Sequence, residues 1–225
     1  MTSPFPNPVL NLEELLKEAE IAHGHLCAGQ ILGVRMAMLG CERLNVEDPR
    51  GRLSPKDRKR LVTFVEIDRC ATDAIAVVTG CRLGKRALKF RDWGKMAATF
   101  VDLASPLHTA GEATVYKAIR IAALESSKAH ARELYPHIEN KNQQQMLTYR
   151  ELPLDDLFAQ EWVQVPLHPR EMPGYKSERV ACEECGEGIN YDREVRQMHF
   201  GATRTLCEAC AFPESRYYQP LATPA

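Results

Sequence analysis

The residues best suited to chemistry lie in one short segment, His23-Gly24-His25-Leu26-Cys27-Ala28-Gly29. Two imidazoles and a thiol occur there, between glycines, where one helical pattern gives way to the next. Imidazole nitrogens and thiolates are ligands for transition metals, and a thiolate is also a nucleophile. We therefore predict a metal site or a reactive thiol in this segment.

The backbone conformation of this segment decides which side chains converge. On a continuous helix, His23 and Cys27 would share a face and His25 would point away. In an extended turn the three side chains point the same way, and Gly24 favours that turn. Cys27 would then lie in the first turn of the next helix, where free N–H groups and the helix dipole lower the pKa of a thiol.

Cys70 is predicted to form the opposite wall of the same site. It follows Asp68, a candidate N-cap, and therefore also lies at the start of a helix. Asp73 shares its helix face one turn later and is a candidate for orienting a ligand from behind. Cys81 is a further candidate for this site. The sequence does not itself bring Cys70 beside the first segment.

A second cysteine cluster, near the C-terminus, has the pattern CxxC-x21-CxxC. It consists of Cys182, Cys185, Cys207 and Cys210. Two such pairs offer four thiolates in the tetrahedral arrangement that structural zinc prefers, and Gly186 allows the tight turn after the first pair. A thioredoxin-like redox pair is excluded because two pairs occur and neither follows a buried strand. We predict a closed structural Zn²⁺ site in a small module suited to contact with another protein.

Composition places the chain among ordinary globular proteins. It has 225 residues, 44% apolar and 26% charged, with a formal net charge of −1, so it has no global attraction for nucleic acid or an anionic membrane. No signal peptide is visible, and no apolar run approaches the roughly 20 residues needed to cross a bilayer. We expect a cytoplasmic protein with reduced cysteines; Cys41, on the apolar side of a helix, is expected to be a small buried residue.

The hydrophobic pattern predicts an α+β core domain, with helices covering one face of a small antiparallel sheet. Asn11 is a candidate N-cap, and Gly80 a candidate C-cap. The predicted helices are 12–22, 27–44, 70–79, 111–134 and 139–150, and the predicted strands are 61–67 and the hairpin 87–91/96–103.

Three parts of the chain follow from these elements. The core domain spans 10–150, a proline-containing linker that packs on the core spans 151–177, and a zinc-ribbon or treble-clef-like domain spans 178–213. A basic loop at 45–60 is predicted to be solvated, with nucleic-acid or phosphate binding as the alternative.

The motifs HGHLCAGQILGVRMA and DRCATDAIAVVTGCRLGKRALKFRDWGKMAATF, together with the paired CxxC module, resemble the FmdE-like family of formylmethanofuran dehydrogenase proteins over roughly residues 10–150. The resemblance implies a dimeric α+β protein with a metal-binding cleft. It implies an accessory component of a larger enzyme or a stand-alone metalloprotein, or a metal-dependent oxidoreductase.

The resemblance carries over to individual positions. His23, His25 and Cys27 match the first motif, Cys70 and Asp73 the second, and Cys81 with Gly84 and Lys85 the third. Ala28 stands where the family usually has proline. Arg82 stands where threonine is usual and puts a cation beside Cys81.

Three functions remain open on the sequence. The first is a metalloprotein with a second transition metal, of unassigned identity, in the core cleft and with Cys27 and Cys70 as catalytic thiolates or ligands. The second is a metal-handling or assembly factor that docks a protein partner through the ribbon. The third is a nucleic-acid-binding zinc-ribbon protein.

Overall fold

The computed structural model describes residues 10–53, 59–219 and 221. These residues form two compact units, which divide between Pro173 and Gly174. The proline-rich start of the chain and part of the basic loop, including Lys56 and Arg58, lie outside the described residues.

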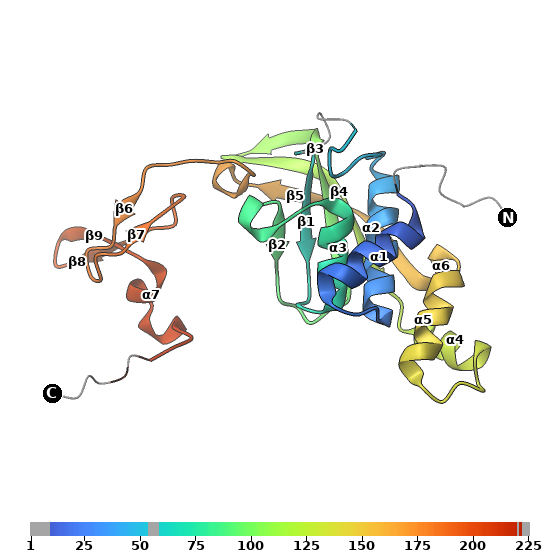
Figure 1. Ribbon diagram of the computed structural model, residues 1–225. Helices are drawn as coiled ribbons and strands as arrows, with labels where there is room; N and C mark the ends of the chain where they lie inside the picture. The colour runs from blue at the N-terminus through green and yellow to red at the C-terminus, as the bar shows by residue number, and fades with distance from the viewer. Residues whose placement is uncertain (1–9, 54–58, 220, 222–225) are drawn as a thin grey trace. The chain divides into compact units, whose positions relative to one another are not determined.

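The first unit contains most of the helices and one five-stranded sheet (Figure 1). Its helices are α1 (Leu12–His23), α2 (Ala28–Arg43), α3 (Cys70–Thr79), α4 (Ser126–Leu134), α5 (Lys141–Glu151) and α6 (Leu154–Leu157), with short 3₁₀ helices at Leu83–Lys85 and Pro169–Glu171. Its strands are β1 (Leu61–Val65), β2 (Leu88–Phe90), β3 (Ala97–Ala110), β4 (Ala113–Ala123) and β5 (Phe158–Leu167).

Local capping signals set the ends of the first helices. The Asn11 side chain accepts a hydrogen bond from the Glu14 N–H at 3.2 Å, as predicted, and Gly80 ends α3 in the left-handed conformation at φ +70°. The prediction that Asp68 caps α3 is wrong. Arg69 occupies the N-cap position, and its side chain makes no capping hydrogen bond.

The sheet has the strand order β2-β1-β3-β4-β5. All neighbouring pairs are antiparallel except β1 and β2, which are parallel, with Thr63 opposite Leu88. The predicted 87–91/96–103 hairpin is therefore wrong, because β1 lies between β2 and β3. The α+β class itself is confirmed.

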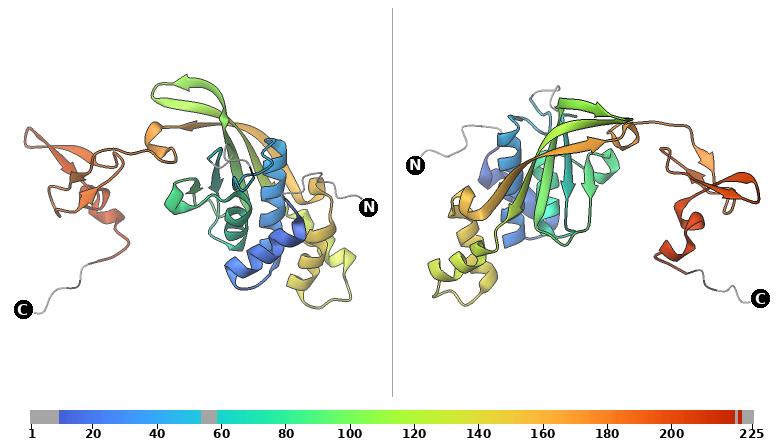
Figure 2. Two further views of the ribbon diagram at one scale, coloured as in Figure 1. Left: turned by 45° about the horizontal axis from the view of Figure 1, so that its top comes forward. Right: turned by 180° about the vertical axis from the view of Figure 1, so that it is seen from behind.

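The helices α1, α2 and α3 cover one face of this sheet, and the view from behind exposes the strands of the other face (Figures 1 and 2). Strand residues alternate between the two faces. Leu61 belongs to the main core beneath the helices, while Val62 belongs to a smaller cluster with Val101 and Leu167 on the other side. Helix α2 is the centre of the core, because every residue from Ile31 to Cys41 is buried.

Two further predictions differ from the structure. The segment 111–134, predicted as one helix, contains β4 followed by α4. The segment 151–177, predicted as a linker, contains β5, which pairs with β4 along its whole length from Phe158 to Leu167.

The second unit is small and holds the four C-terminal cysteines. Its elements are β6 (Val180–Ala181), β7 (Gly188–Ile189), β8 (Val195–His199), β9 (Ala202–Leu206), α7 (Glu208–Ala211) and a 3₁₀ helix at Pro213–Ser215. The pairs β6–β7 and β8–β9 are antiparallel hairpins, and the second of these was predicted. Its small core contains Cys182, Ile189 and Leu206.

Across the described residues, none of the helices is both long enough and apolar enough to span a bilayer.

Candidate metal site and its cavity

The turn between α1 and α2 brings both histidines and the first cysteine together. Gly24 ends α1 at φ +95° and donates its N–H to the Glu20 carbonyl at 2.7 Å. Cys27 follows in the extended conformation as the N-cap of α2. As a result, His23, His25 and Cys27 each place a potential ligand atom within 4.8 Å of the others. This is the extended-turn arrangement, and the continuous helix is excluded.

Asp73, on α3, fixes the orientation of His23. Its Oδ2 lies 2.8 Å from Nδ1 of His23, and the His23 side chain is only 18% exposed. A carboxylate on one ring nitrogen leaves the other nitrogen, Nε2, directed away and free to bind a metal.

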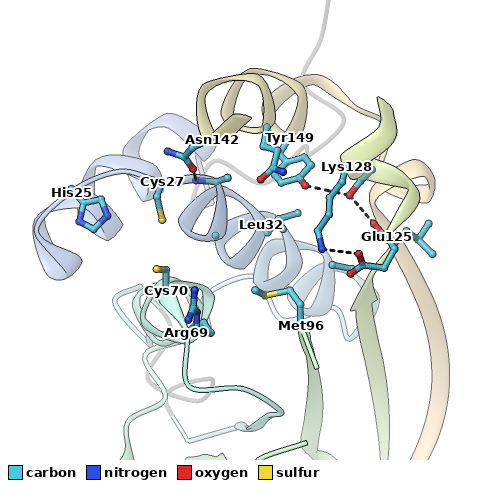
Figure 3. A pocket seen from close by; sticks show the side chains of 16 residues that line it. His25, Cys27, Leu32, Arg69, Cys70, Met96, Glu125, Lys128, Asn142 and Tyr149 are labelled. Atoms are coloured by element: carbon cyan, nitrogen blue, oxygen red, sulfur yellow. Dashed lines mark hydrogen bonds and ion pairs between the residues drawn. The ribbon is translucent and has the colours of Figure 1, made fainter. Parts of the chain in front are cut away.

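Cys70 faces Cys27 because α2 and α3 pack unusually closely. A Cβ added at Gly33 would lie 2.4 Å from the Ala71 carbonyl oxygen, and one added at Gly29 would lie 3.2 Å from the Cys70 Cβ. The Gln30 side chain adds a 2.6 Å hydrogen bond to the Cys70 carbonyl. In Figure 3 the two sulfur atoms point toward one another across the mouth of a cavity.

The pKa of the Cys70 thiol is raised, contrary to what its place at a helix start predicts. Burial raises this pKa most, and the neighbouring Cys27 thiol raises it further. The Arg69 guanidinium acts in the opposite direction but does not reverse the shift. Two thiols so close together disfavour a second negative charge, and a bound cation would remove that penalty.

A cavity of about 520 Å³ extends inward from these residues. Leu32 and Met96 contribute apolar wall, and Lys128 and Glu125 form a 2.6 Å ion pair at the far end (Figure 3). The cavity is therefore apolar in its middle and polar at both ends, which is usual for a small-molecule site.

Asn142, on α5, connects this cavity to the cysteine segment. Its Oδ1 accepts the Ala28 N–H at 3.2 Å, which satisfies the first turn of α2 in place of a side-chain cap from Cys27. Sequence reasoning missed Asn142 and the Glu125–Lys128 pair. The 111–134 segment was predicted as helix throughout, and no local signal connects Asn142 with Ala28.

Other candidates from the sequence lie away from this cavity. Cys81 is 3% exposed, and its sulfur lies 3.5 Å from both the Thr63 hydroxyl and the Leu61 carbonyl. Lys85 lines a different cavity. Cys41 is buried, as predicted, and burial raises the pKa of its thiol.

In the second unit, the four cysteine sulfurs lie within 4.8 Å of one another. Gly186 takes φ +75°, as the tight turn requires. The pKa of Cys182 is lowered to about 6 by backbone N–H groups of the cysteine turns, including the Cys207 N–H at 3.3 Å from its sulfur. Backbone donors aimed at a sulfur stabilise a thiolate, which is the form that binds metal. The ligand set therefore fits a soft or borderline cation.

Comparison with known proteins adds three findings. Residues 22–159 match the family model described as "FmdE, Molybdenum formylmethanofuran dehydrogenase operon". Over 95 residues, the chain is 40% identical to a probable S-adenosyl-L-methionine-binding protein of Archaeoglobus fulgidus; the match covers 42% of this chain and a quarter (25%) of that relative.

A solved structure also resembles this chain. It is an FmdE-like protein of the tungsten formylmethanofuran dehydrogenase type from Syntrophus aciditrophicus, with a TM-score of 0.55 and 18% sequence identity. The likeness covers 96% of this chain and 100% of that one, and it establishes a shared fold.

Proposed function

The chain belongs to the FmdE family, and we propose that its core domain is a transition-metal protein with His23, His25, Cys27 and Cys70 as the ligands. The supporting observation is the convergence of the first three donors beside a cavity that Cys70 also lines. A mixed imidazole and thiolate set suits zinc, iron or copper better than magnesium or calcium.

The cavity gives this site a use beyond structure. A metal held at its mouth would act as a Lewis acid toward a small molecule bound next to it. The chain's own residues position and enclose that molecule: Leu32 and Met96 exclude water, and Lys128 can neutralise an acidic group at the far end. Asp73 holds His23 in one orientation, so the ligand set is arranged before the metal binds.

We further propose that Cys182, Cys185, Cys207 and Cys210 hold a structural zinc ion. Four thiolates fill a tetrahedral site and leave no position open for substrate. A unit of this size with so small an apolar core needs such an ion for stable folding.

Metal analysis of purified protein tests both proposals. We expect one metal ion in the core and one in the ribbon for the unmodified protein, and loss of the core ion alone in a Cys27→Ala/Cys70→Ala variant. Cys41→Ala is the matched control, because it removes a buried cysteine outside the site, and it should keep both ions. Cobalt substitution should give thiolate charge-transfer absorption that weakens in the double variant.

Equal metal content in the unmodified protein and the double variant would refute the core site. A separate Cys182→Ser variant should lose the ribbon ion and keep the core ion.

A metal-handling role with a protein partner is the second candidate, and one observation favours it. The β8–β9 hairpin exposes Met198 and Phe200, with 71% and 97% of their surface accessible. We propose this tip as a protein contact and the protein as a homodimer. Light scattering after size exclusion measures the oligomer. A dimer that persists in Phe200→Ser would place the dimer contact elsewhere and leave the tip for another partner, whereas a monomeric unmodified protein would refute the homodimer.

A further inference from the structure

A second cavity lies in the first unit, at the opposite end of α3 from Cys70. It has a volume of about 390 Å³ and is formed by the second half of α1, the loop after Pro49, the end of α3 and the turn 82–85. A volume of this order falls within the range of small-molecule sites, roughly 300–1,000 Å³.

The charge lining this cavity is strongly positive. Arg50, Arg52, Arg82 and Lys85 contribute four cations, against the single carboxylate of Glu18 among the described residues. The pKa of Glu18 is lowered, since hydrogen bonds from Arg50 and Arg52 outweigh the opposing effect of burial. The carboxylate is therefore ionised at neutral pH and still leaves the cavity with excess positive charge.

The cations divide into two pairs with different environments. Arg50 hydrogen-bonds to Glu18 and packs on Gly80, and Arg52 lies 3.3 Å from the same carboxylate. These contacts give Arg50 and Arg52 a structural role. Arg82 and Lys85, in contrast, are exposed and form no ion pair in the described part of the chain.

The remaining wall is apolar. Val77 and Ala22 line the cavity, and Ile21 leaves 83% of its surface exposed at the rim. An exposed isoleucine beside unpaired cations fits a ligand with an apolar part as well as an anionic part.

We propose that this cavity binds a phosphorylated small molecule, with Arg82 and Lys85 as the principal contacts to the phosphate. Two free cations beside a third partly neutralised one match the double charge of a phosphate ester better than the single charge of a carboxylate. The apolar wall formed by Ile21 and Val77 contacts the organic part. This site is separate from the metal site and does not depend on it.

Calorimetric titration of the full-length protein at about 50 mM salt tests the proposal. Adenosine 5′-monophosphate is the probe, with inorganic phosphate and adenosine as its two halves. We expect the monophosphate to bind more tightly than either half. Arg82→Ala/Lys85→Ala should weaken binding by at least about tenfold, since each charge-assisted hydrogen bond contributes roughly 1.5–3 kcal/mol.

The control Arg132→Ala/Lys141→Ala removes the same number of positive charges from α4 and α5 and should leave the affinity unchanged. Cys27→Ala/Cys70→Ala should also keep it, which separates this site from metal coordination by the phosphate. Absence of binding at millimolar monophosphate, or equal weakening in the control, would overturn the proposal. So would tight binding of an oligonucleotide without binding of the monophosphate, because that result indicates an extended basic surface.

Discussion

The Gly33→Ala substitution is a stringent test of the packing that brings Cys70 to the core site. A Cβ at position 33 would lie 2.4 Å from the Ala71 carbonyl oxygen, 2.7 Å from the Ala71 Cα and 2.8 Å from the Ala74 Cβ. Ordinary contacts between such atoms are about 3.5–4.0 Å. The first two atoms belong to the backbone of α3, so no side-chain rotation can relieve the overlap. Helices α2 and α3 would have to separate by about 1 Å.

The magnitude follows from two opposing terms. Overpacking costs about 1–3 kcal/mol, and two rigid helices place this case at the upper end. Alanine returns about 1 kcal/mol through its better helix propensity. We therefore expect the free energy of unfolding to fall by about 2 kcal/mol, which for a protein of this size lowers Tm by roughly 4–8 °C.

Tryptophan fluorescence during urea unfolding is the appropriate assay. The two tryptophans, Trp93 and Trp162, both lie in the first unit, so the signal reports that unit and not the ribbon. The matched control is Gly29→Ala, in the same helix, where the nearest contact would be a tolerable 3.2 Å and the stability should change little. Metal affinity should weaken in Gly33→Ala, because Cys70 moves with α3. A Gly33→Ala protein as stable as the unmodified one would refute the close packing.

Two further predictions concern polar contacts in the first unit. Arg60, Ser105 and the Ala104 N–H hydrogen-bond to Asp102 and lower its pKa, although burial opposes them. Because the folded-state pKa lies below the unfolded value of about 3.9, the stabilisation is complete above that pH and is lost as the pH falls through the folded-state pKa. Asp102→Asn should cost roughly 3 kcal/mol at pH 7 and progressively less below pH 4 in urea unfolding. Asn142→Ala removes the acceptor for the first turn of α2; it should cost about 1 kcal/mol and weaken core metal binding, measured by competition with a chelator.

Much of the local structure could be predicted from the sequence because its causes are local. The Asn11 cap, the Gly80 terminus of α3 and the turn at Gly24 each depend on one residue and its immediate neighbours. The ribbon hairpin is similar, because the cysteine spacing leaves few other arrangements.

The larger error in the fold has a physical explanation. Strand β4 lies between β3 and β5 and is buried on both faces, with Val115, Tyr116, Ala118 and Ile119 all inside. Such a strand loses the alternation that identifies a half-buried one, and its apolar spacing also satisfies a helical pattern. The prediction of a single helix over 111–134 failed for this reason.

Pairing between distant segments was the other limit. The parallel contact of β1 with β2 cannot be distinguished by sequence from a local hairpin, and both have suitable turn residues. Asn142 meets Ala28 across 114 positions of the chain, with no signal in either neighbourhood. These contacts are set by the packed core and not by local preference.

The core site joins both kinds of information. His23, His25 and Cys27 converge through a single turn, so their proximity could be predicted from glycine placement and side-chain alternation. Cys70 reaches them only because Gly33 lets α3 approach α2 at backbone distance. The same approach also brings Asp73 to His23, since both Cys70 and Asp73 lie in the first turn of α3. One close helix crossing therefore positions a candidate ligand and the carboxylate that orients another, so disturbing that crossing should weaken both contacts together.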